Sequence, residues 1–305
     1  MRFARTAQRR AVLAKALVSR MAGWTPWARI PERDLVVLNY HGTQRRFMRN
    51  LEEQLSFYRS NFRVISPADL DSFFGTQVSA AGGPLLLLNF DDGIRNNLYA
   101  ADLLERTGIH AFFHVVPAFI DTPEEEQSRY FIERIRPSID PEIDAKPEDL
   151  TAMSWQDLGD LARAGHEVGS HSFTHLLRLQ GLSSDSRRRE IVDSRRRIAA
   201  GCGIAPDKVR AFCGPFDSLL SCGTAELALI LDNYEYFFST LYGSNCHPKD
   251  PYFIKRSNVE AFWSLEAVKF ATGGLNRLRW RGRLMSFQNT LQKARRLSCG
   301  TQQGL

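Results

Sequence analysis

The run Leu85–Phe90 (LLLLNF) constrains the fold most strongly, because it is apolar on both faces and ends at two adjacent carboxylates, Asp91 and Asp92. A strand buried on both faces is typical of a parallel sheet that helices cover. Neighbouring parallel strands also need a crossover connection, which is usually a helix. The run therefore predicts an α/β domain in which charged residues follow the carboxyl end of a buried strand.

Short apolar runs alternate with helical patterns along much of the chain. Strands are predicted at Leu35–Asn39, Phe62–Ser66, Leu85–Phe90, Ala111–Val116, Glu167–Ser170, Val209–Cys213, Glu235–Ser239 and Phe253–Val259. Helices are predicted at Asn50–Asn61, after the Ser66-Pro67 start signal, after Asp92 to about Thr107, at Ser154–Ala164 and at Ser184–Gly201. About seven such units with right-handed crossovers predict a distorted, incomplete (β/α)7 barrel. In a barrel of this kind, reactive side chains gather at the carboxyl ends of the strands.

Charge divides the chain into three parts. Residues 1–31 hold seven Lys or Arg and no acid, and residues 267–305 hold eight and no acid. Together these two ends carry a charge of +15. Because the whole chain carries +6, residues 32–266 carry 6 − 15 = −9. We therefore expect a basic extension at 1–31, a catalytic domain at 32–266 and a basic tail at 267–305. Residues 121–150, rich in Pro, Glu and Asp, read as a surface insertion in that domain.

The location of the basic charge argues against nucleic acid as a partner, because a nucleic-acid groove needs that charge on the folded face. Each basic end also carries apolar residues at helical spacing, such as Leu13 and Leu17 in the first and Phe287 and Leu291 in the last. Such helices either lie on an anionic membrane surface or pack on the domain. The sequence leaves both readings open.

The five cysteines form no CxxC pair and no disulfide pattern, so we expect reduced thiols. No apolar run approaches the ~18 residues of a spanning helix. The apolar stretch Ala11–Val18 is short and contains Lys15, unlike a signal peptide. We expect a cytoplasmic protein, with a peripheral position at the inner face of a membrane as the open alternative.

Asp91 and Asp92 are costly to bury without a cation nearby. A bound metal ion or an arginine would offset this cost, whereas the alternative reading is a helix N-cap. A second polar motif, His171-Ser172-Phe173-Thr174-His175, also follows a predicted strand. Two histidines and one carboxylate are typical of a catalytic zinc or related divalent site, and the alternative is a pair of partly exposed histidines.

Together these segments resemble the polysaccharide deacetylase family, the NodB-homology domain. The resemblance covers roughly residues 35–260 and rests on LLLLNFDDG, HAFFHVVPAFI and SWQDLGDLARAGHEVGSHSFTH. Glu190-Ile191 followed by Ser194 is also similar to the family. The resemblance implies the family's distorted barrel. It also implies one divalent metal ion, zinc first with cobalt or nickel as alternatives, held by Asp92, His171 and His175.

The resemblance also assigns chemical roles. It implies that Asp91 is the base for water activated by the metal, and that the backbone N–H of Phe216 stabilises the oxyanion. The family's third motif departs here, because Cys213 stands where an arginine is usual and Asp217 where a small residue is usual. We hypothesise that Arg256 replaces the missing cation.

The family's late histidine motif is not evident, but Asn39-Tyr40-His41-Gly42 follows the first strand. This stretch is similar to the Tyr-His element of a subgroup with permuted motif order. We therefore predict His41 as the general acid, oriented by Asp217; a structural, loop-capping histidine is the alternative.

The predicted activity is hydrolysis of a carbon–nitrogen bond, with removal of an N-acetyl group from an amino sugar. The sugar would belong to a polysaccharide or to its lipid- or nucleotide-linked precursor. An O-acetyl or other N-acyl hydrolase on the same site and a non-catalytic sugar-binding relative remain alternatives. Sugars stack on aromatic rings, for which the candidates are Trp155, Phe173, Phe216, Tyr242 and Trp263.

Overall fold

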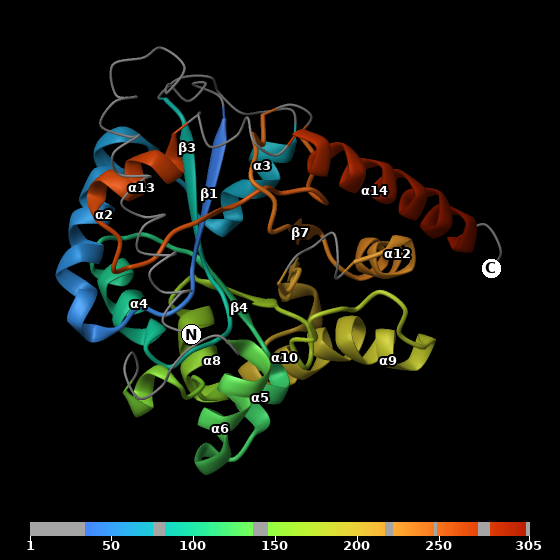
Figure 1. The fold of residues 1–305 in the computed structure, drawn as a ribbon, viewed down its shortest axis with the longest axis horizontal. Helices are drawn as coiled ribbons and strands as arrows, with labels where there is room; N and C mark the ends of the chain where they lie inside the picture. Colours follow the sequence, from blue (N-terminus) through green and yellow to red (C-terminus); the bar gives the residue numbers. More distant parts are fainter. Residues whose placement is uncertain are drawn as a thin grey trace, which may run out of the picture.

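A computed structural model describes residues 34–75, 83–136, 146–216, 222–246, 249–273 and 281–302. The predicted extension at 1–31 and the predicted orienting residue Asp217 lie outside these ranges. Within them, one parallel sheet organises the molecule, and the site residues follow its strands (Figure 1).

The sheet runs in the order β7-β6-β5-β4-β3-β1-β8, and β2 also pairs with β3. All of these pairings are parallel. The strands are β1 (Leu35–Tyr40), β2 (Arg63–Val64), β3 (Leu85–Phe90), β4 (Phe112–Val115), β5 (Glu167–Ser170), β6 (Ala211–Cys213), β7 (Tyr236–Phe238) and β8 (Ser257–Asn258). The long β1–β3 pair is in full register from Leu35 opposite Leu85 to Tyr40 opposite Phe90.

One short segment links the two ends of this curled sheet. Ile254 forms a parallel bridge with Phe238 of β7, and β8 pairs with β1 only a few residues later. The backbone N–H of Arg256 donates to Leu241 O. The predicted α/β fold with a distorted, incomplete barrel is confirmed as a curled parallel half-barrel sheet.

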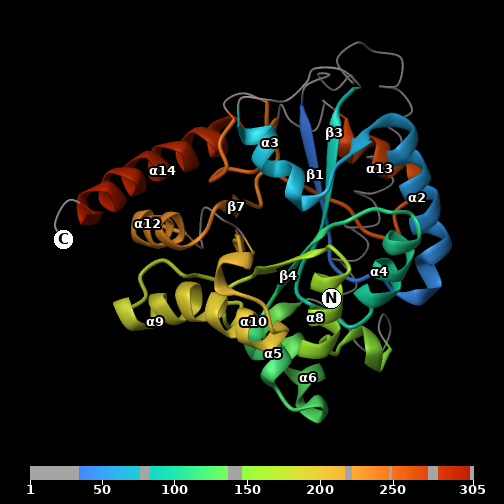
Figure 2. The ribbon, with the colours of Figure 1, turned by 180° about the vertical axis from the view of Figure 1, so that it is seen from behind.

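Helices cover the outside of the sheet (Figures 1 and 2). They are α2 (Met48–Asn61), α3 (Leu70–Phe74), α4 (Asn97–Arg106), α5 (Pro117–Asp121), α6 (Glu124–Tyr130), α8 (Trp155–Arg163), α9 (Ser184–Arg188), α10 (Ser194–Cys202), α12 (Thr224–Asn233), α13 (Leu265–Thr272) and α14 (Arg281–Gln302). The shorter turns are the 3-10 segments η2 (Arg45–Phe47), η3 (Pro67–Asp69), η5 (Pro147–Asp149) and η7 (Pro206–Lys208), and the π-helical segments η4 (Phe131–Ile135) and η6 (Arg189–Asp193).

Strand alternation divides the core into two clusters, which explains why the strands are apolar on both faces. One set of side chains, with Leu86 and Leu88 of β3, packs under the helices. The other set, with Leu85 and Leu87 of the same strand, fills the inside of the curled sheet. Asn89 and Asp91 continue the inner set toward the carboxyl end of β3, so polar groups follow directly on an apolar inner layer.

The structure departs from the predicted elements at several places. The strands predicted at Phe62–Ser66 and Phe253–Val259 shrink to the two-residue strands β2 and β8, and α12 and α13 were not predicted. Within residues 121–150, predicted as a surface insertion, the described part is helical over α6 and η4. Phe131 and Ile135 are buried there, so this segment forms part of the core near the site.

The predicted basic C-terminal helix is present as α14, which lies alongside α12 (Figures 1 and 2). Phe287, Leu291 and Ala294 follow each other at helical spacing and are buried. The Phe287 ring stacks on Phe253 with centroids 4.6 Å apart and on Phe237 at 5.7 Å. This apolar face packs on the domain. Among the described helices, none is long and apolar enough to cross a membrane.

The packing of α14 predicts a difference between two positions on that helix. Phe287→Ala should destabilise the protein by about 3–5 kcal/mol, because a buried ring is lost and a cavity remains. Met285→Ala, at a side chain that is 65% exposed, should change stability by less than about 0.5 kcal/mol. Urea unfolding measures both, and equal losses would contradict the packing described for α14.

Candidate metal centre and catalytic pocket

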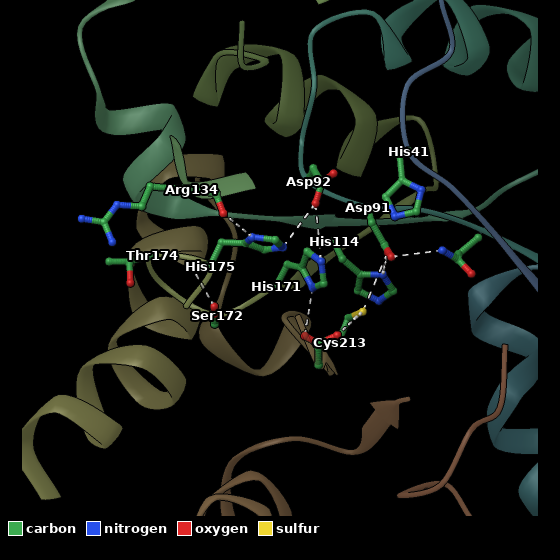
Figure 3. Close-up of polar contacts among 12 residues, drawn as sticks. His41, Asp91, Asp92, His114, Arg134, His171, Ser172, Thr174, His175 and Cys213 are labelled. Carbon is green, nitrogen blue, oxygen red and sulfur yellow. Dashed lines mark hydrogen bonds and ion pairs between the residues drawn. The ribbon is translucent and has the colours of Figure 1, made fainter. Parts of the chain in front are cut away.

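Three strand ends bring the polar motifs together at one edge of the sheet. Asp91 and Asp92 follow β3, His171 follows β5, and Cys213 ends β6. Figure 3 shows the side chains of Asp92, His171 and His175 converging. All of these residues are at least 95% buried, so their polar atoms need partners within the protein.

Asp92, His171 and His175 have the arrangement of a metal triad. Asp92 Oδ1 lies 3.5 Å from the Nε2 atom of each histidine, and the three ligand atoms are within 4.8 Å of one another. The other oxygen, Asp92 Oδ2, is buried and has no hydrogen-bond partner within the described structure. A buried carboxylate with one oxygen facing two imidazoles and the other without a partner is the arrangement that a cation would satisfy.

The outer contacts of the two histidines fix their protonation. His171 Nδ1 lies 3.0 Å from Cys213 O, and His175 Nδ1 lies 3.2 Å from Arg134 O (Figure 3). A carbonyl oxygen only accepts, so each Nδ1 carries the proton and each Nε2 keeps its lone pair. Metal-binding histidines are commonly held in this way. The residues present therefore fit a divalent ion.

The electrostatics of the site also favour neutral imidazoles. Burial lowers the pKa of His171 to about 4, although Asp91 and Asp92 act in the opposite direction. Burial likewise lowers the pKa of His175. Metal ligation needs the neutral imidazole. Near neutral pH, both histidines are therefore already in the form that binds a metal ion and do not have to release a proton first.

Backbone strain is concentrated at this site. In the described structure, the residues other than glycine with positive φ are Asp92 (77°), Ser172 (63°), His175 (57°) and Phe216 (50°). Such conformations cost on the order of 1–3 kcal/mol each and persist only where the surroundings enforce them. Ser172 Oγ accepts from the backbone N–H of His175 at 3.1 Å, which helps to hold one of these turns.

Glu190 holds the histidine loop from the side. Its Oε2 accepts from the backbone N–H groups of Phe173 (3.0 Å) and Thr174 (2.9 Å), and its Oε1 accepts from the Thr174 hydroxyl at 2.6 Å. Glu190 is buried and lies in the π-helical segment η6, which interrupts the long predicted helix. A π-helical turn of this kind often occurs at functional sites. Glu190 thus ties η6 to the loop between the two histidines.

Asp91 is the centre of a second, deeper polar cluster. Arg256 Nη1 lies 2.8 Å from both oxygens of Asp91, and His114 Nδ1 lies 3.2 Å from Oδ1. Asn39 Nδ2 approaches Oδ2 at 3.4 Å, and the Cys213 thiol lies 3.8 Å from Oδ1. The guanidinium comes from the segment that links the sheet ends, and the thiol occupies the motif position where the family usually has arginine.

This cluster keeps Asp91 ionised. Burial would raise the pKa of Asp91, but the Arg256 guanidinium and the hydrogen bond from His114 hold it well below its usual range. Burial raises the pKa of the Cys213 thiol well above its ordinary value. The thiol therefore stays neutral beside the carboxylate, and Arg256 is the charged partner.

His41 is held by Glu260 within the described structure. Its Nδ1 lies 3.1 Å from Glu260 Oε1, which Asn258 Nδ2 also approaches at 3.3 Å. Burial and Arg136 lower the pKa of His41, but Glu260 together with Asp92 outweighs them, so the pKa is raised. Asp217, the predicted partner, lies outside the described residues.

A pocket of about 350 Å³ opens onto both clusters. Its described walls are Asn39, His41, Asp91, Asp92, Ile135, Arg136, His171, His175, Gly214, Phe216, Thr240, Tyr242, Arg256 and Asn258. Of the aromatic candidates for sugar stacking, Phe216 and Tyr242 line it, whereas Trp155, Phe173 and Trp263 are absent from its described walls. The Phe216 ring lies 4.5 Å from the His175 ring.

Residues 79–227 match the family model for polysaccharide deacetylase. This part of the chain is similar to that family. The matched range includes Asp91, Asp92 and both histidines, but not His41, Arg256 or Glu260. The permuted position of the acid histidine is therefore a proposal beyond the family assignment.

Solved structures share the fold of this chain. The BpsB deacetylase domain from Bordetella bronchiseptica aligns with a TM-score of 0.58 at 18% identity, over 76% of this chain and 98% of that one. The Streptococcus pyogenes deacetylase PplD, in complex with acetate, gives 0.58 at 14% identity, over 78% and 98%. IcaB from Ammonifex degensii gives 0.56 at 18% identity, over 78% and 97%. No curated protein sequence matches the chain.

Three side chains of this site were not predicted from the sequence. His114 was noted only as part of a family-like stretch, and Glu190 only as part of a family-like helix. Glu260 was not noted, although it follows a predicted strand, as the other site residues do. Their partners lie 16 to 219 residues away in the chain, so no local spacing could reveal the contacts.

Glu190 gives a prediction about metal affinity. Glu190→Gln replaces the carboxylate by an amide that accepts through only one atom, so the histidine loop loosens and zinc binding weakens about tenfold or more. Zinc-dependent shifts of the melting temperature measure this.

Glu226→Gln is the matched control, since Glu226 is an equally buried carboxylate that binds Arg187 and Gly223 rather than the loop. It should lower stability but leave the zinc shift intact. The same loss of affinity in both variants would mean that Glu190 acts only on general stability.

Proposed function

We propose that this polysaccharide deacetylase relative is a metal-dependent hydrolase that removes an N-acetyl group from an amino sugar. The sugar would belong to a polysaccharide or to its lipid- or nucleotide-linked precursor. One observation carries the proposal: two imidazole Nε2 atoms converge on Oδ1 of Asp92, whose Oδ2 has no described partner, beside a buried, ionised Asp91 in one pocket.

Asp92, His171 and His175 would hold the ion, and zinc is the first choice for an N/N/O set with open positions. Such an ion polarises an acetyl carbonyl and acidifies water, which an unactivated amide requires. The Nδ1 contacts to Cys213 O and Arg134 O keep both rings oriented for this task.

Asp91 would take the proton of the attacking water. The contacts with Arg256 and His114 keep it in the carboxylate form and fix the direction of its oxygens. A strongly held carboxylate is a weak base, but it is ionised at every working pH. Arg256 acts here as a positioning residue through Asp91.

The backbone N–H of Phe216 would stabilise the oxyanion of the tetrahedral intermediate. Phe216 lines the pocket, and its positive φ is the kind of strain that functional loops retain. One donor of this type contributes roughly 3–4 kcal/mol to catalysis.

His41 would donate a proton to the leaving amine. It lines the pocket and is anchored by Glu260, which favours the charged imidazolium. An acid with a raised pKa remains protonated closer to neutral pH, which suits this step.

The same groups would also hydrolyse an O-acetyl ester or another N-acyl group, so substrate comparison is part of the test. Acetylated amino sugars and acetyl esters are incubated with the zinc-loaded protein, and released acetate is measured by mass spectrometry. Acetate from amides supports the proposal. Release from esters alone favours the esterase, and release from neither favours a non-catalytic sugar-binding relative.

The division of roles predicts two classes of variant. Asp91→Asn should keep zinc and lose activity by at least about 100-fold, the size of a general-base effect. Asp92→Ala and His171→Ala should lose zinc first, and activity with it. Metal content by atomic emission is measured beside turnover, and equal zinc in all three proteins would contradict the assignment.

His41 and Glu260 predict the pH profile. A general acid works below its pKa, so activity falls as pH rises through the pKa of His41. Glu260→Gln removes the carboxylate that raises this pKa, and the alkaline limb of kcat/KM should move to lower pH.

Arg136→Gln is the control of opposite sign. Arg136 lowers the pKa of His41, so its removal should move the same limb to higher pH. Profiles that shift in one common direction, or not at all, would contradict His41 as the acid.

A further inference from the structure

Arg136 stands on the wall of the pocket directly after the π-helical segment η4. Phe131 and Ile135 of η4 are buried, and the backbone N–H of Arg136 donates to Phe131 O. These contacts fix the Arg136 backbone at the pocket. Its side chain remains 32% exposed. Among the described wall residues, Arg136 and Arg256 are the arginines, and Arg256 is buried against Asp91.

The guanidinium of Arg136 makes only one long ion-pair contact within the described structure. It lies 4.0 Å from Glu260 Oε1, an oxygen that already serves His41 and Asn258. No hydrogen bond from its side chain to a described residue is present, although a guanidinium offers five donors. Arg136 is therefore a pocket cation with spare donors.

The carboxylates of the pocket have closer partners than Arg136. Asp91 pairs with Arg256, and Glu260 pairs with His41 in its protonated form. Asp92 belongs to the histidine triad. Among the described residues, Arg136 thus shares its carboxylate partner Glu260 with His41, which is closer to it, and a cation in this position attracts an anionic ligand.

The position of Arg136 relative to the acid indicates where the anion sits on the substrate. His41 is the proposed donor to the leaving nitrogen, and Glu260 connects His41 to Arg136 through contacts of 3.1 and 4.0 Å. In a 2-acetamido sugar the anomeric oxygen is on the carbon next to the one that carries the nitrogen. With the leaving nitrogen at His41, a group on that oxygen would lie next to the acid, where a cation that shares Glu260 with His41 would meet it.

We propose that Arg136 binds a phosphate on the anomeric oxygen of the amino sugar, so that the substrate is a glycosyl phosphate rather than an uncharged polymer. Arginine suits this task because its planar fork binds phosphate oxygens in pairs. The pocket volume of about 350 Å³ is near the small end for ligand sites, roughly 300–1,000 Å³, as a single terminal sugar requires. The inference rests on the proposed deacetylation and names its substrate class.

The test compares charged and uncharged substrates in three proteins. N-acetylglucosamine 1-phosphate, UDP-N-acetylglucosamine and methyl N-acetylglucosaminide are given to the zinc-loaded wild type, to Arg136→Gln and to Arg129→Gln. Arg129 is 67% exposed in the same segment and pairs only with Glu126 among the described residues, so it controls for the loss of one charge.

The wild type should prefer the phosphorylated sugars in kcat/KM, and Arg136→Gln should reduce that preference about 10- to 100-fold, the range for hydrogen bonds to a charged group. Arg129→Gln should retain the preference. The ratio between substrates cancels the effect of Arg136 on the acid His41, which acts on all substrates alike. A preference that survives Arg136→Gln, or no preference in the wild type, would overturn the inference.

A binding measurement separates this inference from the proposed function. Calorimetry with Asp91→Asn measures the affinities for N-acetylglucosamine 1-phosphate and for the methyl glycoside without turnover. If no substrate releases acetate but the Arg136-dependent preference in binding remains, the deacetylation proposal fails and the phosphate site stands. If acetate is released equally from all sugars, the phosphate site fails and deacetylation stands.

The same comparison distinguishes the two sources of a glycosyl phosphate. UDP-N-acetylglucosamine represents a soluble nucleotide donor, and an N-acetylglucosaminyl phosphate of a long-chain isoprenoid in anionic vesicles represents a lipid donor. Both should depend on Arg136, since the phosphate is common to them, and the higher kcat/KM identifies the source. Dependence of neither on Arg136 overturns the site.

Discussion

The ion pair between Asp91 and Arg256 is the interaction on which the rest of the site depends. Both side chains are 2% exposed, so each would carry a large desolvation cost if the other were absent. The two residues are 165 positions apart: Asp91 follows β3, and Arg256 lies between the Ile254 bridge to β7 and strand β8, which pairs with β1. The guanidinium therefore reaches the carboxylate from the segment that links the two ends of the sheet.

Sheet closure and site assembly are thus the same structural event. Arg256, Asn258 and Glu260 occupy every second position in the segment that links the two sheet ends, so their side chains point to the same side of it. They bind Asp91, Asn39 and His41 in turn. One short stretch of chain pairs with β1 at Asn258 and supplies partners for the proposed base and the proposed acid. The fold and the chemistry cannot be altered independently there.

The sequence predicted the fold and the grouping of Asp92, His171 and His175 because both depend on local patterns. The strand Leu85–Phe90 and the histidine motif after Glu167–Ser170 could be read within a dozen residues. Glu260, His114 and Glu190 act through contacts that the topology creates, so their functions needed the structure. The lengths of β2 and β8 were predicted too long for a related reason. Most apolar residues of these predicted strands are buried, but only two residues of each belong to a strand of the sheet.

The departure at Cys213 follows the same logic. The family position for arginine lies at the end of β6, yet the cation reaches Asp91 from the other side of the half-barrel. A buried carboxylate stays ionised when a positive charge lies nearby, whichever strand or loop that charge comes from. Once Arg256 supplies that charge, the position at β6 needs only a small neutral side chain, and a thiol that stays protonated meets the requirement. The altered motif is therefore a relocation of the cation that Asp91 needs, and the electrostatic condition for an ionised base is kept.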